Sequence, residues 1–574
     1  MRENLNILWA ELIIEEFVRN RIDHFCICPG SRSSPIVVAV ARNKKAKPVI
    51  CYDERGASFY ALNYARAKRR PAVVITTSGT AVANCFPAVI EAYMDCVPVI
   101  IFSADRPPEL QDSKENQTIY QEDIFGRYVK YFFNIPPAEE NIPPQMLLTT
   151  VDQAIYRSIS HPNGPVHINW MIREPLAPEK VPFNPSYTCS LSDWLVSERP
   201  YTEYPVPEKD ISEDQIRKIA GLINEAENGL LIIGETGCKG HILELLKKIP
   251  WPVFSDIRSG IYPYMSENVL PYFSLLLRSF IPKKNPDLVI HIGKPVVSKH
   301  IYQLIRLARR YVVIKEGPFR QDPVHRSMMQ IDCSIKIFCE KIIPYISAKR
   351  SKGLEELRRI CEKISVFLED LMKGREEINE AILAYDISKN IPERTALFLS
   401  NSMPVRDMDM YGRIEKEVEI YANRGASGID GIVSSSIGIA QGSKKLTTAI
   451  IGDLAFLHDM NSLSILKRTD SAVIFVLINN GGGGIFSFLP ISKFNKVFEY
   501  FFTPHHICSF EPIASLFEIP YFPVKKREDL LKAYRECVRK RKSAIIEVFV
   551  DREENFRFHK KVEDEIKKIQ ESVS

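Results

Sequence analysis

Two short segments of the chain carry the oxygen ligands that a magnesium ion prefers. Gly452-Asp453-Leu454 ends one strand-like run, and Asn479-Asn480 with the glycines up to Gly484 ends the next. The interval between them is long enough for a βαβ crossover, which brings the two strand ends side by side. An Asp carboxylate, an Asn carbonyl and a backbone carbonyl suit Mg²⁺ held with the phosphates of a cofactor, and glycines let the backbone approach a diphosphate closely. The alternative is an ordinary βαβ unit in which Asp453 only forms a turn.

Two loops near the N-terminus also combine residue types that do chemistry. Residues 29–35 follow a predicted strand and contain glycine, serines and Arg32, which suits an anion-binding corner in which Arg32 holds a carboxylate. The alternative is a capped helix start with a solvated arginine. Glu54, in the segment 53–57, is either a helix-start carboxylate favoured by the helix dipole or a buried acid with a proton-transfer role.

The elements that position these loops alternate along the whole chain. Short β-branched runs alternate with helical patterns, which predicts an α/β fold of three parallel-sheet domains with boundaries at 1–188, 189–360 and 361–574. A proline-containing linker is expected at 187–209 and a charged helix at 351–379. The expected strands are 25–28, 49–52, 72–76, 97–103 and 166–169, then 229–233, 253–255, 288–292 and 311–314, and finally 396–399, 419–422, 447–451, 472–478 and 544–549.

The bulk properties indicate a cytoplasmic enzyme and disfavour a nucleic-acid-binding, secreted or membrane-spanning protein. The 574 residues are too many for one core, and a net charge of +5 from 76 basic and 71 acidic residues does not favour nucleic-acid binding. The 12 cysteines are scattered without a CxxC pair, which is typical of free thiols in a reducing compartment. Acidic residues among the first apolar ones predict an amphipathic helix rather than a signal peptide, and no apolar run reaches membrane-spanning length.

Nine motifs, taken together and in order, resemble one family of thiamine-diphosphate enzymes, the 2-succinyl-5-enolpyruvyl-6-hydroxy-3-cyclohexene-1-carboxylate synthases of menaquinone biosynthesis. The match covers both end blocks, whereas the middle block is similar mainly around Ser298-Lys299. Leu454 departs from the usual Gly-Asp-Gly form of the diphosphate motif, a change that this family tolerates. The motifs are residues 29–35, 53–57, 76–84, 103–110, 116–119, 401–402, 423–431, 452–454 and 484–487.

The resemblance implies doubly wound pyrimidine-binding, central and diphosphate-binding domains and a carboligase reaction. Such an enzyme decarboxylates 2-oxoglutarate and adds the resulting succinyl-semialdehyde carbanion equivalent to isochorismate in a Stetter-like 1,4-addition. The nearest alternative is another thiamine-diphosphate 2-oxoacid decarboxylase or an acetolactate-synthase-like enzyme. A protein of another class, which keeps the fold for binding or regulation only, is disfavoured because Glu54, Asp453 and Asn480 are all present.

The resemblance also implies a role for each cofactor residue. Glu54 matches the carboxylate that hydrogen-bonds N1′ of the cofactor's aminopyrimidine, and it must exchange a proton there. Ile429 matches the apolar residue that wedges the cofactor into its bent form. Asp453, Asn480 and the carbonyl of Gly482 match the ligands of Mg²⁺ or Mn²⁺. Further cofactor contacts are expected at Ser78, Gly79, Leu454, Ile485 and Phe486.

Both implied substrates are dicarboxylates, so their site needs several fixed cations. The basic set is Arg32, Arg106, Lys299, Arg406 and Arg424, and the neutral donors are Ser31, Gln117, Asn401 and Ser402, of which Gln117 joins Arg32 and Glu54 in the catalytic set. His300 stands where the family commonly shows an arginine, which weakens one carboxylate contact if His300 is neutral. The family implies a homodimer or homotetramer with the active site between subunits. The loop 234–237 looks like a nucleotide-binding loop but is expected to be scaffold.

Overall fold

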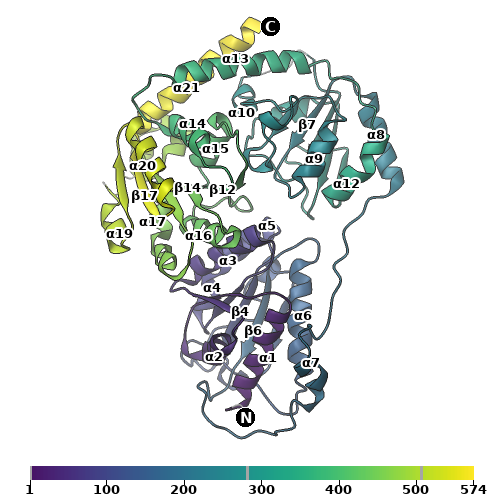
Figure 1. The fold of residues 1–574 in the computed structure, drawn as a ribbon, viewed down its shortest axis with the longest axis vertical. Coiled ribbons are helices and arrows are strands. Elements are labelled where there is room, and N and C mark those ends of the chain that lie inside the picture. Colours follow the sequence, from purple (N-terminus) through teal and green to yellow (C-terminus); the bar gives the residue numbers. More distant parts are fainter. Residues whose placement is uncertain (1–2, 280–283, 504–508, 574) are drawn as a thin grey trace. The chain divides into compact units, whose positions relative to one another are not determined.

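The computed structural model describes residues 3–279, 284–503 and 509–573, which form three sheets (Figure 1). Contacts within the chain divide it into two units, which are described separately. The first unit contains Met1–Pro207, Asn423–Thr447 and Ala455–Val473, and the second contains Glu208–Ala422, Thr448–Leu454 and Ile474–Ser574. No helix in the described part of the chain is both long and apolar enough to cross a membrane.

The sheet of the first unit is parallel, with the strand order β2-β1-β3-β4-β6-β5. The five expected strands are present, with ends that differ by up to three residues. The sequence analysis missed β5, an edge strand that is only partly buried and therefore lacks a strong apolar pattern. The strands are β1 His24–Ile27, β2 Lys47–Ile50, β3 Val73–Thr76, β4 Ile100–Asp105, β5 Phe132–Ile135 and β6 Val166–Met171.

Helices α1 and α6 lie side by side against this sheet and close its main core (Figure 1). The predicted N-terminal helix forms as α1, but it is buried along most of its length, including Glu16. Trp9, Phe17 and Trp170 are among the fully buried large side chains of this core. The helices of this unit are α1 Leu5–Arg19, α2 Ser34–Arg42, α3 Glu54–Lys68, α4 Thr80–Asn84, α5 Phe86–Met94, α6 Gln145–Ile159, α7 Ser192–Val196 and α16 Ile432–Ser443.

The expected linker 187–209 is partly structured. Its first part forms a short 3₁₀ turn and α7, and Trp194 packs into the core of the first unit. The indole N–H of Trp194 and the backbone N–H of Tyr201 both donate to Glu16, each over 2.6 Å. The apolar anchor and the buried acceptor together tie this segment to α1, whereas residues 203–210 are exposed.

Helices α3 and α16 pack closely because α16 presents glycines to the α3 backbone. A Cβ atom on Gly438 would lie 2.3 Å from the carbonyl oxygen of Tyr60. One on Gly442 would lie 2.6 Å from the carbonyl oxygen of Tyr64, so neither position accommodates a side chain without a shift. This contact fixes the position of α3, which begins at Glu54, and of the loop that leads into α16.

The second unit contains the other two sheets, with the strand orders β11-β10-β9-β7-β8 and β13-β12-β14-β15-β17-β16. Every expected strand is present, and four of the expected ranges match the observed bounds. The missed strands β11 and β16 are again partly buried edge strands. The bounds are β7 Gly229–Ile233, β8 Val253–Ser255, β9 Leu288–Ile292, β10 Arg310–Lys315, β11 Met329–Asp332, β12 Thr395–Leu399, β13 Val418–Tyr421, β14 Thr447–Gly452, β15 Val473–Asn479, β16 Tyr521–Val524 and β17 Ala544–Phe549.

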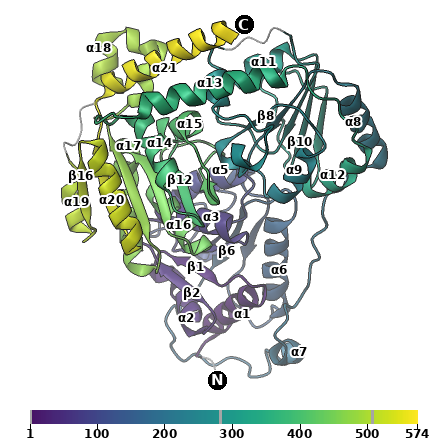
Figure 2. The ribbon, with the colours of Figure 1, turned by 45° about the horizontal axis from the view of Figure 1, so that its top comes forward.

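The helices of the second unit cover both sheets, and α13 runs side by side with α21 (Figures 1 and 2). The charged helix expected at 351–379 is α13, and it ends earlier than expected, at Met372. The helices are α8 Glu213–Glu225, α9 Lys239–Leu246, α10 Phe273–Leu276, α11 Ile301–Leu307, α12 Ile335–Ile342, α13 Leu354–Met372, α14 Glu380–Asn390, α15 Met403–Tyr411, α18 Asn495–Val497, α19 Glu511–Leu516, α20 Arg527–Lys540 and α21 Arg552–Val573.

Candidate functional site

Glu54 occupies the first position of α3 at the carboxyl-end side of the first sheet. Asp53 caps the helix by accepting the backbone N–H of Arg55 over 2.8 Å. The Glu54 carboxylate is half-buried and accepts from Nδ2 of Asn84 over 3.3 Å. Burial, with a contribution from the Glu54 charge, raises the pKa of the neighbouring Cys85 thiol to about 12. Glu54 therefore starts the helix, and its half-buried carboxylate lies near the buried Cys85 thiol; its proton-transfer role stays a prediction.

Arg32 and Arg106 form a pair of neighbouring cations in the first unit. Arg32 is only 4% exposed, and its guanidinium donates to the carbonyl of Ile172 over 2.8 Å. Burial and then the charge of Arg106 lower the pKa of Arg32. The Nε atoms of both arginines are buried without a hydrogen-bond partner, and neither arginine forms an ion pair within the described residues. Two neighbouring guanidinium groups at this position favour a bound anion.

The loop after β3 presents polar atoms that the protein itself leaves unsatisfied. The hydroxyls of Thr77 and Ser78 are buried without a partner among the described residues. Gly79 has φ of +87°, and a Cβ atom there would lie 3.2 Å from Cβ of Gln117. Gln117 is exposed and has φ of +52°. A polar ligand bound at this loop could form hydrogen bonds with the unpartnered hydroxyls of Thr77 and Ser78.

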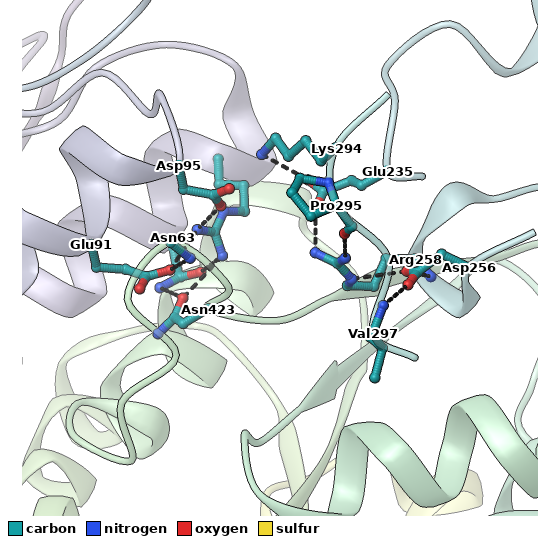
Figure 3. A network of polar contacts seen from close by, with 12 residues as sticks. Asn63, Glu91, Asp95, Glu235, Asp256, Arg258, Lys294, Pro295, Val297 and Asn423 are labelled. Atoms are coloured by element: carbon teal, nitrogen blue, oxygen red, sulfur yellow. Dashed lines mark hydrogen bonds and ion pairs between the residues drawn. The ribbon is translucent and has the colours of Figure 1, made fainter. Parts of the chain in front are cut away.

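The loop 423–431 presents Ile429, which is 38% exposed although it is apolar. The loop is held from α5 by Glu91, which accepts the backbone N–H of Gly425 over 2.8 Å and that of Ala426 over 2.6 Å. Burial raises the pKa of Glu91. Figure 3 shows Glu91 beside Asp95 and Asn423, and Arg66 links the latter two with bonds of 2.7 and 2.9 Å.

In the second unit, the three predicted metal ligands meet at one turn. Asp453 begins α17 (Asp453–Asp459), and its Oδ2 accepts the backbone N–H of Asn480 over 3.1 Å and that of Gly482 over 2.9 Å. The backbone N–H of Gly482 also donates to Oδ1 of Asn480 over 3.1 Å. Gly481, Gly482 and Gly483 have φ of 76°, 92° and 70°, a left-handed path that glycine adopts without strain.

The donor set at this turn fits a hard divalent cation. It offers one carboxylate, one carboxamide oxygen and one backbone carbonyl, which leaves further positions around Mg²⁺ or Mn²⁺ to phosphate oxygens and water. In residues 3–279, 284–503 and 509–573, no group of three or more His, Cys, Asp or Glu side chains could hold a metal ion. The three predicted ligands are not such a group, because only Asp453 among them is a His, Cys, Asp or Glu residue.

The remaining site residues of the second unit lie at strand ends and helix starts. Asn401 is buried after β12, and Ser402 has φ of +72° at the start of α15. Arg406 donates to the carbonyl of Ser402, and burial lowers the pKa of Arg406. Ile485 and Phe486 are half-buried in the 3₁₀ segment Gly484–Phe488.

Lys299 is exposed just before α11, and His300 beside it is half-buried. Burial, followed by the charges of Arg278 and Lys299, lowers the pKa of His300 below its usual value near 6.5. His300 is therefore neutral at pH 7 and adds no positive charge beside Lys299. The lowered pKa is consistent with the expectation that a neutral His300 weakens that carboxylate contact.

The loop 234–237 of the central sheet is filled by the protein's own groups. A Cβ atom on Gly234 would lie 1.8 Å from the carbonyl oxygen of Lys294. The Glu235 carboxylate pairs with Arg258 over 3.0 Å and with Lys294 over 3.2 Å, and Arg258 also binds Asp256 over 2.9 Å (Figure 3). These contacts pair the charged side chains around the loop with one another, and the scaffold role stays a prediction.

The structure brings several predicted residues together within each unit, and it adds two that the sequence analysis missed. In the first unit, Ser31 is exposed next to the buried Arg32, and Arg424 lies in the loop that carries Ile429. In the second unit, Leu454 follows Asp453 and is half-buried. The missed residues are Glu91 and Glu380. A lone acid in the apolar helix 86–94 was an available signal for Glu91, whereas Glu380 resembles any acid at a helix start.

Comparisons with known proteins agree with this geometry. Family models of thiamine pyrophosphate (thiamine diphosphate) enzymes match three stretches: the N-terminal TPP binding domain at residues 9–124, the middle domain at 185–399 and the C-terminal TPP binding domain at 410–548. Benzoylformate decarboxylase from Polynucleobacter necessarius has a similar fold, with a TM-score of 0.75 over 96% of this chain and 99% of that one at 15% identity.

Curated relatives match over nearly the full length. The 2-succinyl-5-enolpyruvyl-6-hydroxy-3-cyclohexene-1-carboxylate synthase of Rubrobacter xylanophilus is 39% identical over 97% of this chain and 98% of its own. The protein of the same name from Chlorobium phaeobacteroides is 37% identical over 99% of both chains. The chain therefore belongs to the 2-succinyl-5-enolpyruvyl-6-hydroxy-3-cyclohexene-1-carboxylate synthase family of thiamine-diphosphate enzymes.

Proposed function

We propose that the protein is a transferase of menaquinone biosynthesis that decarboxylates 2-oxoglutarate and adds the succinyl-semialdehyde unit to isochorismate. The products are 2-succinyl-5-enolpyruvyl-6-hydroxy-3-cyclohexene-1-carboxylate and CO₂. The observation that carries this proposal is the near full-length identity of 37–39% to relatives named for that product. The fold neighbour at 15% identity supports the architecture only.

The cofactor is thiamine diphosphate, which both TPP binding domains of the family take. When bound, thiamine diphosphate supplies the electron sink for decarboxylation. Asp453, Asn480 and the Gly482 carbonyl would hold Mg²⁺ or Mn²⁺ against the diphosphate. Ser78, Gly79, Leu454, Ile485 and Phe486 would line the cofactor, and the exposed Ile429 would support its bent form. The clustering of the three metal ligands around Asp453 supports this assignment.

Glu54 would act as the proton-exchanging acid at N1′ of the pyrimidine ring. A carboxyl group suits this task because it can accept and return a proton, which a carboxamide cannot. Glu54 is half-buried at the start of α3, and its one side-chain hydrogen bond within the described residues is to Asn84, which leaves an oxygen for the ring nitrogen.

The two dicarboxylate substrates would be held by the predicted cations. Arg32 and Arg106 already lie together without a carboxylate partner, which supports a carboxylate site in the first unit. Lys299, Arg406 and Arg424 would supply the other positive charges. The neutral donors would be Ser31, Gln117, Asn401 and Ser402, with Arg32 and Gln117 close to the reacting carbons.

The proposal extends to assembly and location. The functional unit would be a homodimer or homotetramer in which the pyrimidine-binding domain (1–188) of one subunit meets the diphosphate-binding domain (361–574) of another. The central domain (189–360) would act as scaffold and contribute Lys299. We place the enzyme in the cytoplasm, without a nucleic-acid or membrane partner, on the basis of its balanced charge and scattered cysteines.

The test is an omission experiment on the full-length protein. Consumption of isochorismate should require 2-oxoglutarate, thiamine diphosphate and Mg²⁺ together, with equimolar CO₂ release. Release of CO₂ from a 2-oxoacid with isochorismate untouched would move the assignment to the decarboxylase alternative. Replacing 2-oxoglutarate with pyruvate is the matched control, because a pocket built for a dicarboxylate should turn over a small monoacid poorly.

A further inference from the structure

A buried acid lies behind the carboxamide of Asn480. Nδ2 of Asn480 donates to Oε1 of Glu380 over 2.8 Å, and Glu380 is 2% exposed. A carboxamide donates only through its nitrogen, so an acceptor at this position selects one of the two amide orientations. In that orientation Oδ1 faces the diphosphate turn, where it accepts the backbone N–H of Gly482 over 3.1 Å.

Glu380 is itself held in place from several sides. It begins α14, which Asn379 caps by accepting the backbone N–H of Ile382 over 2.9 Å. Its own backbone N–H donates to Oδ1 of Asn555 in α21 over 3.1 Å. A Cβ atom on Gly484 would lie 2.5 Å from Nδ2 of Asn480 and 3.4 Å from Oε1 of Glu380, so the backbone of Gly484 packs directly against this hydrogen-bonded pair.

We propose that Glu380 is a positioning residue that fixes the Asn480 carboxamide with its oxygen toward the metal. The inference rests on the proposed function, because it takes Asn480 as a ligand of Mg²⁺ or Mn²⁺. Without the acceptor, the amide loses its preferred orientation, and half of its orientations would aim an NH₂ group at the cation. Partners that orient metal ligands typically change metal affinity about 10–100-fold when they are removed.

The test measures metal binding directly, apart from turnover. Full-length protein with saturating thiamine diphosphate is titrated with Mn²⁺, and free Mn²⁺ is followed by its electron paramagnetic resonance signal. Glu380→Leu keeps the packing volume without an acceptor and should raise the apparent Kd for Mn²⁺ about 10–100-fold. Glu380→Gln keeps an acceptor oxygen and should restore most of the affinity. Glu377→Ala, an exposed acid in the same segment, is the matched control and should leave the Kd unchanged.

A double-mutant cycle separates positioning from a general structural effect. If Glu380 acts through Asn480, then Asn480→Ala combined with Glu380→Leu should weaken Mn²⁺ binding no more than Asn480→Ala alone. Fully additive losses would overturn the inference, as would a Glu380→Leu variant that binds Mn²⁺ like the wild type. Urea unfolding of each variant shows whether it is folded. If Glu380→Leu does not fold, the comparison uses Glu380→Gln instead. A loss of Mn²⁺ affinity in Glu380→Gln as large as that in Asn480→Ala would count against the inference.

The outcomes also distinguish this inference from the function on which it rests. If Asn480→Ala weakens Mn²⁺ binding and Glu380→Leu does not, only the positioning role is wrong. If Asn480→Ala leaves Mn²⁺ binding unchanged, the ligand assignment itself fails, and the inference fails with it.

Discussion

Replacing Glu91 tests how the loop 423–431 is held. Glu91 lies 2% exposed in α5, and its two oxygens accept the backbone N–H groups of Gly425 and Ala426. Glu91→Ala removes both bonds and leaves Arg66 with one fewer carboxylate, which lay 3.7 Å away. Hydrogen bonds to charged groups contribute about 1.5–3 kcal/mol each.

The solvent exposure of the two backbone N–H donors, those of Gly425 and Ala426, limits the stability lost in Glu91→Ala. Gly425 is half-buried and Ala426 is exposed, so water can satisfy part of what the carboxylate leaves behind. Removing a buried carboxylate also recovers part of its desolvation cost. Two such bonds would contribute about 3–6 kcal/mol, and after these offsets we expect the free energy of unfolding to fall by about 2–4 kcal/mol. Because Ile429 belongs to the freed loop, the Kd for thiamine diphosphate should rise about tenfold, which corresponds to about 1.4 kcal/mol.

The assay combines urea unfolding, followed by far-ultraviolet circular dichroism, with a fluorescence titration of thiamine diphosphate. Glu109→Ala is the matched control, because Glu109 pairs with Arg173 on the surface over 2.7 Å and should cost less than about 1 kcal/mol. A change below about 1 kcal/mol in Glu91→Ala with an unaltered Kd would refute the claim that Glu91 holds the loop.

Three further predictions address the acid, the linker and the turn. Glu54→Gln should fold and bind thiamine diphosphate yet lose about 10²–10⁴-fold in turnover, measured as isochorismate consumption, and activity near the wild-type level would exclude the proton-exchange role. Burial and a neighbouring carboxyl raise the pKa of Glu16 to about 8, so the folded state binds the extra proton and stability falls as pH rises from about 4.5 to 8. In urea unfolding, the free energy of unfolding of the wild type should fall by roughly 2 kcal/mol between pH 6 and 8, and Glu16→Gln should flatten this fall. Gly483→Ala, at φ of +70° and with a Cβ atom 2.0 Å from the carbonyl of Phe502, should weaken Mn²⁺ binding and stability, whereas Gly452→Ala, with open space at its Cβ position, should do neither.

The sequence predicted the elements whose signal is local. Buried central strands read as apolar runs, and the close contacts of Asp453 with Asn480 and Gly482 follow from a βαβ spacing. The three missed strands are partly buried edge strands, whose alternation is diluted by polar residues.

Contacts that depend on tertiary structure could not be predicted in this way. Glu91 and Gly425 are 334 positions apart, and no local pattern relates them. The same holds for Asn480 and Glu380, which are 100 positions apart. The Trp194 anchor in the expected linker was also missed, because its partner Glu16 belongs to a helix 178 positions earlier.

The tight packing of α3 on α16 limits how this chain can be cut or rearranged. Asn63 of α3 donates to Oδ1 of Asn423 over 3.0 Å across 360 positions of sequence, and the glycines of α16 fit only the α3 backbone. A fragment that ends at Pro207 would lack α16 and expose the α3 face that it covers. The segment that ends at Pro207 is therefore not an independent domain, because it needs α16 from much later in the chain. Gene fission or domain shuffling after residue 207 should therefore give an aggregation-prone product, and insertions are better tolerated in the exposed stretch that follows Tyr201.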